Sequence, residues 1–219
     1  WTATLSYVAT AYGVILGFSI VFLFGQFAGA RAAVGDEATA IGTAFDQSVM
    51  FPGTESGLRQ ALICYGLAVP EHGWPALREQ RASPIVDQAF TDIVDALDTG
   101  DAPTEGAVHS GVATSMANQV ADISTARATR LVAAETSVPV LLWVLLVGGA
   151  IFVISLIFIV TSSASPRSQA VLVAAATVFT VVMVMLVYVL STPFADAPGR
   201  VTPRLIVDTT TAMQRQEPG

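Results

Sequence analysis

The sequence predicts an all-α integral membrane protein, because charged residues are missing from three long stretches. These stretches are Trp1 to Ala30, Thr136 to Pro166 and Ser168 to Ala195. Each can hold a helix of about 20 apolar residues, the length that crosses a hydrocarbon core of roughly 30 Å. Hydrophobic residues make up 53% of the chain and charged residues only 12%, against about 25% charged in soluble domains. The apolar residues do not alternate with polar ones as in a barrel strand, which favours helices.

Three membrane spans are expected within residues 1–27 and 139–190. The first runs from about Leu5 to Phe27, the second from about Pro139 to Val160, and the third from about Gln169 to Leu190. Only a short loop separates the second span from the third. We therefore expect residues 139–190 to form an antiparallel transmembrane hairpin.

A polar helical insert, residues 28–138, is expected between the first and second spans, and residues 191–219 form a C-terminal tail. Within the insert, Pro84–Asp98 and Glu55–Val69 have apolar residues at helical spacing, and Pro70 is expected to stop the second of these helices. Arg31 to Met50 is expected to extend the first span. Thr104 to Glu135 is expected to form one helix continuous with the second span. The clearest loop is 100–103.

Charge limits the partners and predicts the orientation. The net charge of −7 argues against a nucleic-acid partner, which needs a basic surface. Five arginines near span ends lie on the side of the insert and tail (Arg31, Arg127, Arg130, Arg200 and Arg204), whereas Arg167 lies on the other. Since cytoplasmic loops carry the excess of basic residues, we expect the insert and the C-terminal tail to lie in the cytoplasm.

The chain begins with Trp1 and lacks a basic segment before the first apolar stretch. We therefore expect a further N-terminal helix upstream of this sequence, which gives four spans in total.

No pattern typical of an enzyme, metal site or cofactor site occurs in the sequence. His72 and His109 lie 37 residues apart, outside any metal-ligand spacing, and read best as histidines at helix ends or in loops. Cys64 is expected to be a small core residue. The sequence therefore predicts no enzyme activity, metal or cofactor.

Two acidic residues follow the first span directly. Asp36 and Glu37 are candidates for attracting cations. The alternative is a solvated or salt-bridged helix face, and sequence spacing leaves both open.

The first span differs from the other two in its polar residues and glycines. Gly13 and Gly17, like Gly25 and Gly29, form small-xxx-small pairs that permit close helix contact. Candidate pore-lining residues share one helical face (Thr10, Val14, Phe18 and Val21). Such a stripe can form an apolar constriction of a pore. The alternative is an ordinary helix buried by its neighbours.

Four segments carry a family resemblance. They are LGFSIVFLFGQFAGARAAVGDEATAIG from Leu16, EHGWPAL from Glu71, ARATRLVAAETSVPVLLW from Ala126 and STPFADAPGRVTP from Ser191. In this order they resemble the uncharacterised bacterial bestrophin-like membrane proteins, and more distantly the bestrophin ion channels. The resemblance implies four spans and a pentamer whose apolar neck is lined at Thr10, Val14 and Phe18. Thr10 departs from the large hydrophobe expected there.

Two functions from different classes follow. The first is a homo-oligomeric ion channel with the first helix lining the pore. The insert carries 6 arginines against 14 acidic residues, a net charge of −8, which favours cation passage if these acids face the lumen. The second is an accessory or scaffolding subunit of a larger membrane complex. In both, the partners are the lipid bilayer and either further copies or other membrane subunits.

Overall fold

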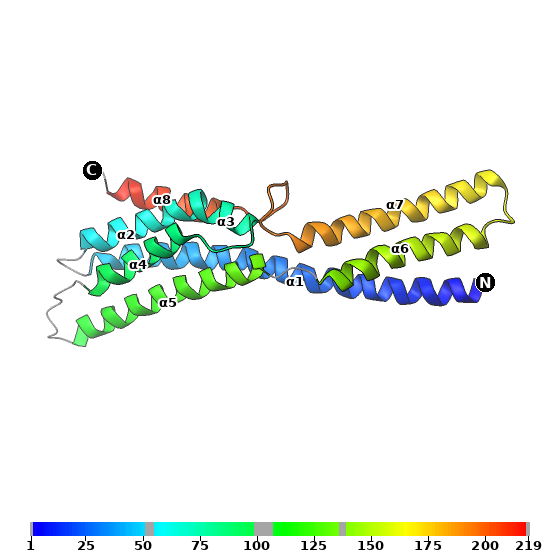
Figure 1. Ribbon diagram of the computed structural model, residues 1–219. Helices are drawn as coiled ribbons and strands as arrows, with labels where there is room; N and C mark the ends of the chain where they lie inside the picture. The colour runs from blue at the N-terminus through cyan, green and yellow to red at the C-terminus, as the bar shows by residue number, and fades with distance from the viewer. Residues whose placement is uncertain (1, 51–54, 99–106, 136–138, 218–219) are drawn as a thin grey trace. The chain divides into compact units, whose positions relative to one another are not determined.

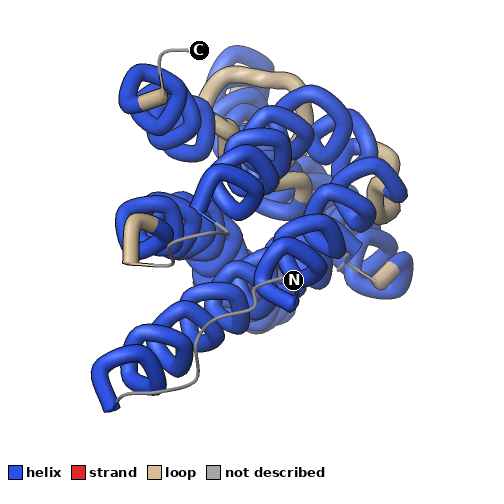
Figure 2. Tube along the Cα trace, turned by 90° about the vertical axis from the view of Figure 1, so that its left-hand side faces the viewer, coloured by secondary structure: helices blue, strands red, loops and turns tan. Residues whose placement is uncertain are grey.

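The computed structural model describes residues 2–50, 55–98, 107–135 and 139–217. These residues form two compact units, and Figure 2 shows that their regular structure is helical. Unit 1 comprises residues 1–27 and 137–192, and unit 2 comprises residues 28–136 and 193–219. The tail therefore belongs to the same unit as the insert.

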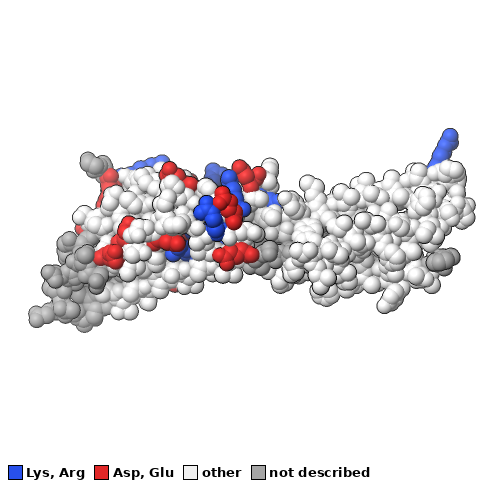
Figure 3. All heavy atoms as spheres, viewed as in Figure 1, with Lys and Arg blue, Asp and Glu red and all other residues white. Residues whose placement is uncertain are grey.

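Unit 1 holds the apolar helices. It contains the first half of α1 (Thr2–Ser48), α6 (Val140–Val160) and α7 (Pro166–Ser191), and each of these three helices is long and apolar enough to cross a membrane. Figure 1 shows α6 and α7 side by side as an antiparallel pair. Arg167 is the single charged residue among the described residues of this unit, and the face seen in Figure 3 is almost free of charge there.

The core of unit 1 lies where α1 meets α6 and α7. Its buried residues are Leu16, Leu23, Leu146, Val187 and Leu190. At Gly149 the Tyr12 ring lies so close to the α6 backbone that an added Cβ would overlap it. The Tyr12 hydroxyl donates a hydrogen bond of 3.1 Å to the carbonyl oxygen of Leu146. A glycine on α6 thus lets α1 approach closely.

Unit 2 is a helical bundle around the second half of α1. It contains α2 (Glu55–Ala68), the π-helical turn η1 (Val69–Gly73), α3 (Trp74–Arg78), α4 (Pro84–Asp98), α5 (Ala107–Glu135) and α8 (Arg204–Gln216). Its fully buried apolar side chains come from every long helix: Phe45, Ile41, Leu58, Leu62, Ile93, Met116, Ile123 and Ile206. The start of α4 at Pro84 and the extension of α1 agree with the sequence predictions.

Three expectations about local structure are wrong. Pro70 does not stop the helix, because the chain passes it in a π-helical turn and continues into α3. The helix before the second span is not continuous with it, since Pro139 has extended backbone (φ −53°, ψ 138°) and α6 begins after it. Cys64 is exposed rather than part of the core. The predicted loop at 100–103 lies outside the described residues.

The contact between α2 and α8 depends on a second glycine. A Cβ at Gly66 would overlap the Oγ1 of Thr210, whereas a Cβ at Gly57, also on α2, meets open space. We expect Gly66→Ala to destabilise the protein by about 1–3 kcal/mol through overpacking. The matched change Gly57→Ala should be neutral or stabilise by up to about 1 kcal/mol, because alanine favours a helix. Thermal unfolding of both variants checks this, and Thr210→Ala should restore part of the loss in Gly66→Ala.

Candidate functional site

The predicted pore-lining residues share the side of α1 that the chain leaves open. Thr10 is exposed, and Val14, Phe18 and Val21 are 52%, 73% and 71% exposed. The side chains that pack against α6 and α7, such as Leu16 and Leu23, lie on another side of the helix. Within the described residues, the first half of α1 is thus packed by its neighbours on one side only. Whether the stripe lines a pore stays a prediction.

The four glycines of the two small-xxx-small pairs have open space around them within the described chain. A Cβ added at Gly13, Gly17, Gly25 or Gly29 meets no other atom within 4 Å. The close contact that these glycines permit is therefore not made with any described residue of the same chain. It remains available to another molecule.

Glu37 lies in a buried polar cluster of unit 2. Its side chain is fully buried, and Arg130 of α5 donates two hydrogen bonds to it, from Nε to Oε2 at 2.8 Å and from Nη2 to Oε1 at 3.0 Å. The hydroxyl of Tyr65 donates a third hydrogen bond to Oε1, at 2.5 Å. Two parallel N–H···O bonds are the strongest geometry for an Arg–carboxylate pair. The salt-bridged alternative thus applies to Glu37, whose charge is matched by Arg130.

Aromatic contacts complete the surroundings of Arg130, which is 2% exposed. Its guanidinium carbon lies 5.4 Å from the centre of the Trp74 ring. Trp74 packs edge-to-face on Phe194, and its indole nitrogen donates a hydrogen bond of 3.4 Å to the carbonyl oxygen of Val201. Desolvation of the guanidinium is therefore offset by the carboxylate and the ring together.

The turn η1 leads into Trp74 and brings Gly73 beside Arg130. An added Cβ at Gly73 would lie 3.6 Å from Nη1 of Arg130 and 3.4 Å from a methyl group of Val86. Five residues of π-helix insert an additional residue relative to an α-helix and rotate the helix that follows. This change of register accompanies the burial of both Gly73 and Trp74.

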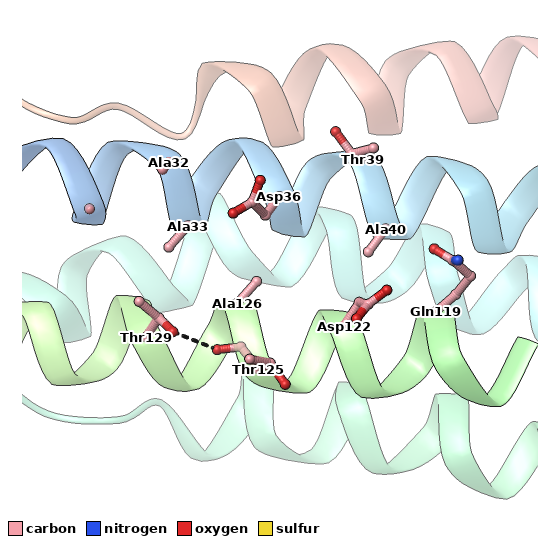
Figure 4. A pocket seen from close by; sticks show the side chains of 11 residues that line it. Ala32, Ala33, Asp36, Thr39, Ala40, Gln119, Asp122, Thr125, Ala126 and Thr129 are labelled. Carbon is pink, nitrogen blue, oxygen red and sulfur yellow. Dashed lines mark hydrogen bonds between the residues drawn. The ribbon is translucent and has the colours of Figure 1, made fainter.

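Asp36 points away from the cluster, into a groove between α1 and α5. The groove encloses about 580 Å³, and Figure 4 shows Asp36 and Asp122 among its labelled side chains. Most of its remaining lining is small: Gly29, Ala32, Ala33, Ala40 and Ala126, with Thr39, Gln119, Thr125 and Thr129 as polar members. Asp36 is exposed. Of the two predicted cation-attracting residues, Asp36 is the one whose carboxylate reaches solvent.

The remaining candidates form no site among the described residues. The Nε2 atom of the half-buried His72 lies 3.9 Å from the carboxylate of its neighbour Glu71. Cys64 Sγ accepts a hydrogen bond of 3.4 Å from Gln60. The His109 side chain lies outside the described residues. Within the described part of the chain, histidine, cysteine and acidic residues form no group suited to a metal ion.

The cluster makes stability sensitive to alkaline pH. Burial, and then the charge of Glu37, raise the pKa of Tyr65 well above its ordinary value of 10.0, although Arg130 opposes this. Because the folded pKa is raised, the unfolded chain releases the Tyr65 proton first. The contribution of Tyr65 to stability is therefore complete below about pH 10 and is lost as the pH rises through the folded pKa.

We expect the unfolding temperature to fall between pH 9 and pH 11 by more in the wild type than in Tyr65→Phe. Thermal unfolding at both pH values measures the two differences. Equal losses in the two proteins would contradict the assignment.

Comparisons with known proteins agree with this architecture. A family model described as the bestrophin-like domain matches residues 2–199. The chain belongs to the bestrophin-like family. No protein with a curated description matches it.

Bestrophin homologues of known structure share the fold. A variant of a bacterial bestrophin homologue from Klebsiella pneumoniae superposes with a TM-score of 0.81 at 13% identity, covering 97% of this chain and 86% of that one. A second structure of a bestrophin homologue from the same organism, phased with zinc, gives 0.80 at 14% identity and covers 99% and 88%. The bestrophin-like chain is therefore an all-helical membrane protein.

The sequence did not predict that Arg130 and Tyr65 bind Glu37, or that Trp74 packs on Arg130. A signal for Arg130 exists, because it lies at helical spacing from the buried residues Ile123 and Ala126 on the apolar face of α5. An arginine on an apolar face indicates a buried partner. Its partner, Glu37, lies 93 residues away in sequence, so pairing required the tertiary structure.

Proposed function

We propose that this protein is a homo-oligomeric ion channel of the bacterial inner membrane, with α1 of each copy lining a central pore. The observation that carries the proposal is the exposure of Val14, Phe18 and Val21 on a helix whose other side is packed. Lipid does not favour the polar Thr10 on the same stripe. A ring of α1 helices removes these residues from lipid and forms a narrow apolar neck at Phe18. Membership in the bestrophin-like family supports the same arrangement.

Cation passage is the preference that the charges favour. Within unit 2, the exposed Asp36 lies with Asp122 in the groove between α1 and α5. In a ring of copies, Asp36 and Asp122 supply negative charge to the vestibule wall, and such charge raises the local concentration of cations.

We propose that the insert and tail lie in the cytoplasm. Arg31, Arg127 and Arg130 follow or precede the spans within unit 2, whereas Arg167 lies in the first turn of α7. An excess of arginine marks the cytoplasmic side. The vestibule would then be the intracellular mouth of the pore.

Ion flux in liposomes tests the channel. The purified protein should form a symmetric ring and release K⁺ from loaded vesicles, and Phe18→Ala should change the flux because it widens the neck. Phe24→Ala is the matched control, since Phe24 is also exposed, at 61%, but lies about 120° away around the helix. Absence of flux in every ionic condition, or equal effects of the two variants, would count against the proposal.

An accessory subunit of a larger complex is the second candidate. The open glycines Gly13, Gly17 and Gly25 favour it, because they suit contact with any partner helix. Co-purification of one copy with unrelated membrane subunits would support this function, whereas a ring of identical copies would support the channel.

A further inference from the structure

Most side chains in the second half of α1 are small. Residues 28–44 contain seven alanines and three glycines among 17 positions. Small side chains also face two of the neighbouring helices, with Ala33 and Ala40 toward the α5 groove and Gly35 and Gly42 toward Leu205 and Thr209 of α8. Steric packing of large side chains into gaps normally fixes how one helix is rotated against another. Along this part of α1 few side chains are large enough to do so.

Glu37 is the single charged side chain that α1 buries among its described residues. Val34 and Ile41 lie on the same side of the helix and are also buried, so apolar burial fixes the orientation of α1 coarsely. The two hydrogen bonds from Arg130 restrict the orientation of α1 more narrowly. A planar guanidinium can donate two parallel hydrogen bonds only to a carboxylate that lies in a narrow range of positions. A third bond, from Tyr65, reaches Glu37 from α2.

We propose that Glu37 and Arg130 are positioning residues that set the rotation of α1 about its axis within unit 2. Glu37 is adjacent in sequence to Asp36, and successive residues of a helix point about 100° apart. With Glu37 held toward α5 and α2, Asp36 and Thr39 face the groove while Ala38 faces the interior, where it is 5% exposed. Without the Glu37–Arg130 pair, apolar burial and the small side chains of α1 permit more than one rotation of α1 about its axis. The ion pair thereby specifies one structure, a role that buried ion pairs have in some proteins.

This inference concerns the folded chain and does not depend on ion conduction. Replacing the single cysteine by Cys64→Ser gives a background without thiols, because the chain contains one cysteine. Thr39→Cys and Ala38→Cys are then introduced one at a time, and the rate of labelling by a water-soluble maleimide is measured for each. The ratio of the Thr39→Cys rate to the Ala38→Cys rate reports the rotation of α1.

We expect a high ratio with Glu37 intact and a ratio lower by roughly tenfold in Glu37→Gln, because the protection of a buried position is lost when the helix turns. Arg130→Lys keeps the charge and loses the planar fork, so its ratio should be intermediate. This second variant serves as the test if Glu37→Gln does not fold. Glu79→Gln, in the exposed pair with Arg81, is the control and should leave the ratio unchanged.

An unchanged ratio in a folded Glu37→Gln or Arg130→Lys protein would overturn the proposal. A rise of both labelling rates by the same factor would also overturn it, because this indicates local unfolding rather than rotation. Circular dichroism and gel filtration establish that each variant is folded. Neither overturning result bears on the channel, whose test is ion flux.

Discussion

Glu37→Gln is expected to lower the free energy of unfolding by about 3–5 kcal/mol, the cost of removing one partner from a buried ion pair. Arg130 would remain 2% exposed with no carboxylate to balance its charge. A glutamine also presents an amide group where Arg130 and Tyr65 now donate hydrogen bonds. A buried donor without a partner loses its hydration and gains nothing in return. For a chain of this size the loss corresponds to a drop of roughly 10 °C or more in unfolding temperature.

Tryptophan fluorescence during thermal unfolding measures this effect, because Trp74 lies on the Arg130 guanidinium. The double variant Glu37→Gln with Arg130→Met should be less destabilised than the sum of the two single variants, since it leaves no unpaired buried charge. Glu79→Gln affects an exposed pair and should hardly change the unfolding temperature. Additive losses in the double variant would contradict the buried pairing.

Asp36→Arg is expected to change ion preference strongly. If Asp36 faces the vestibule, each copy contributes a change of two charge units to one ring, so a cation-attracting ring becomes anion-attracting. Local ion concentration depends exponentially on potential, so we expect the ratio of K⁺ to Cl⁻ permeability to fall by roughly tenfold at low salt. The effect should shrink as ionic strength rises toward 1 M, where the screening length falls to about 3 Å.

Reversal potentials measured in planar bilayers give the permeability ratio directly. Asp95→Arg is the matched control: it makes the same charge change on an exposed position of α4, outside the groove. Its permeability ratio should stay close to that of the wild type. Equal shifts in the two variants would indicate a general effect of net charge. This result would contradict the assignment of Asp36 to the vestibule wall.

Helix type and membrane insertion were predictable because they depend on local pattern. Pro84 begins α4 as predicted, since proline suits a first helical turn. The same reasoning wrongly predicted that Pro70 ends the helix that begins at Glu55. A proline lacks one N–H donor, but a π-helical turn at Val69–Gly73 carries the chain past it. Residues distant in sequence lie beside that turn, since Val86 and Arg130 are the neighbours of its buried Gly73.

The amino-acid sequence by itself determined that the protein lies in a membrane, which helices are apolar, and which face of the first helix bears Thr10, Val14 and Phe18. These properties follow from composition and helical period, which need no knowledge of neighbours. Only the tertiary structure decided the different environments of two adjacent acids. Asp36 reaches the groove, whereas Glu37 is buried against Arg130 and Tyr65. The physical reason is that a carboxylate's role depends on its partners, and here they come from helices 28 and 93 residues away.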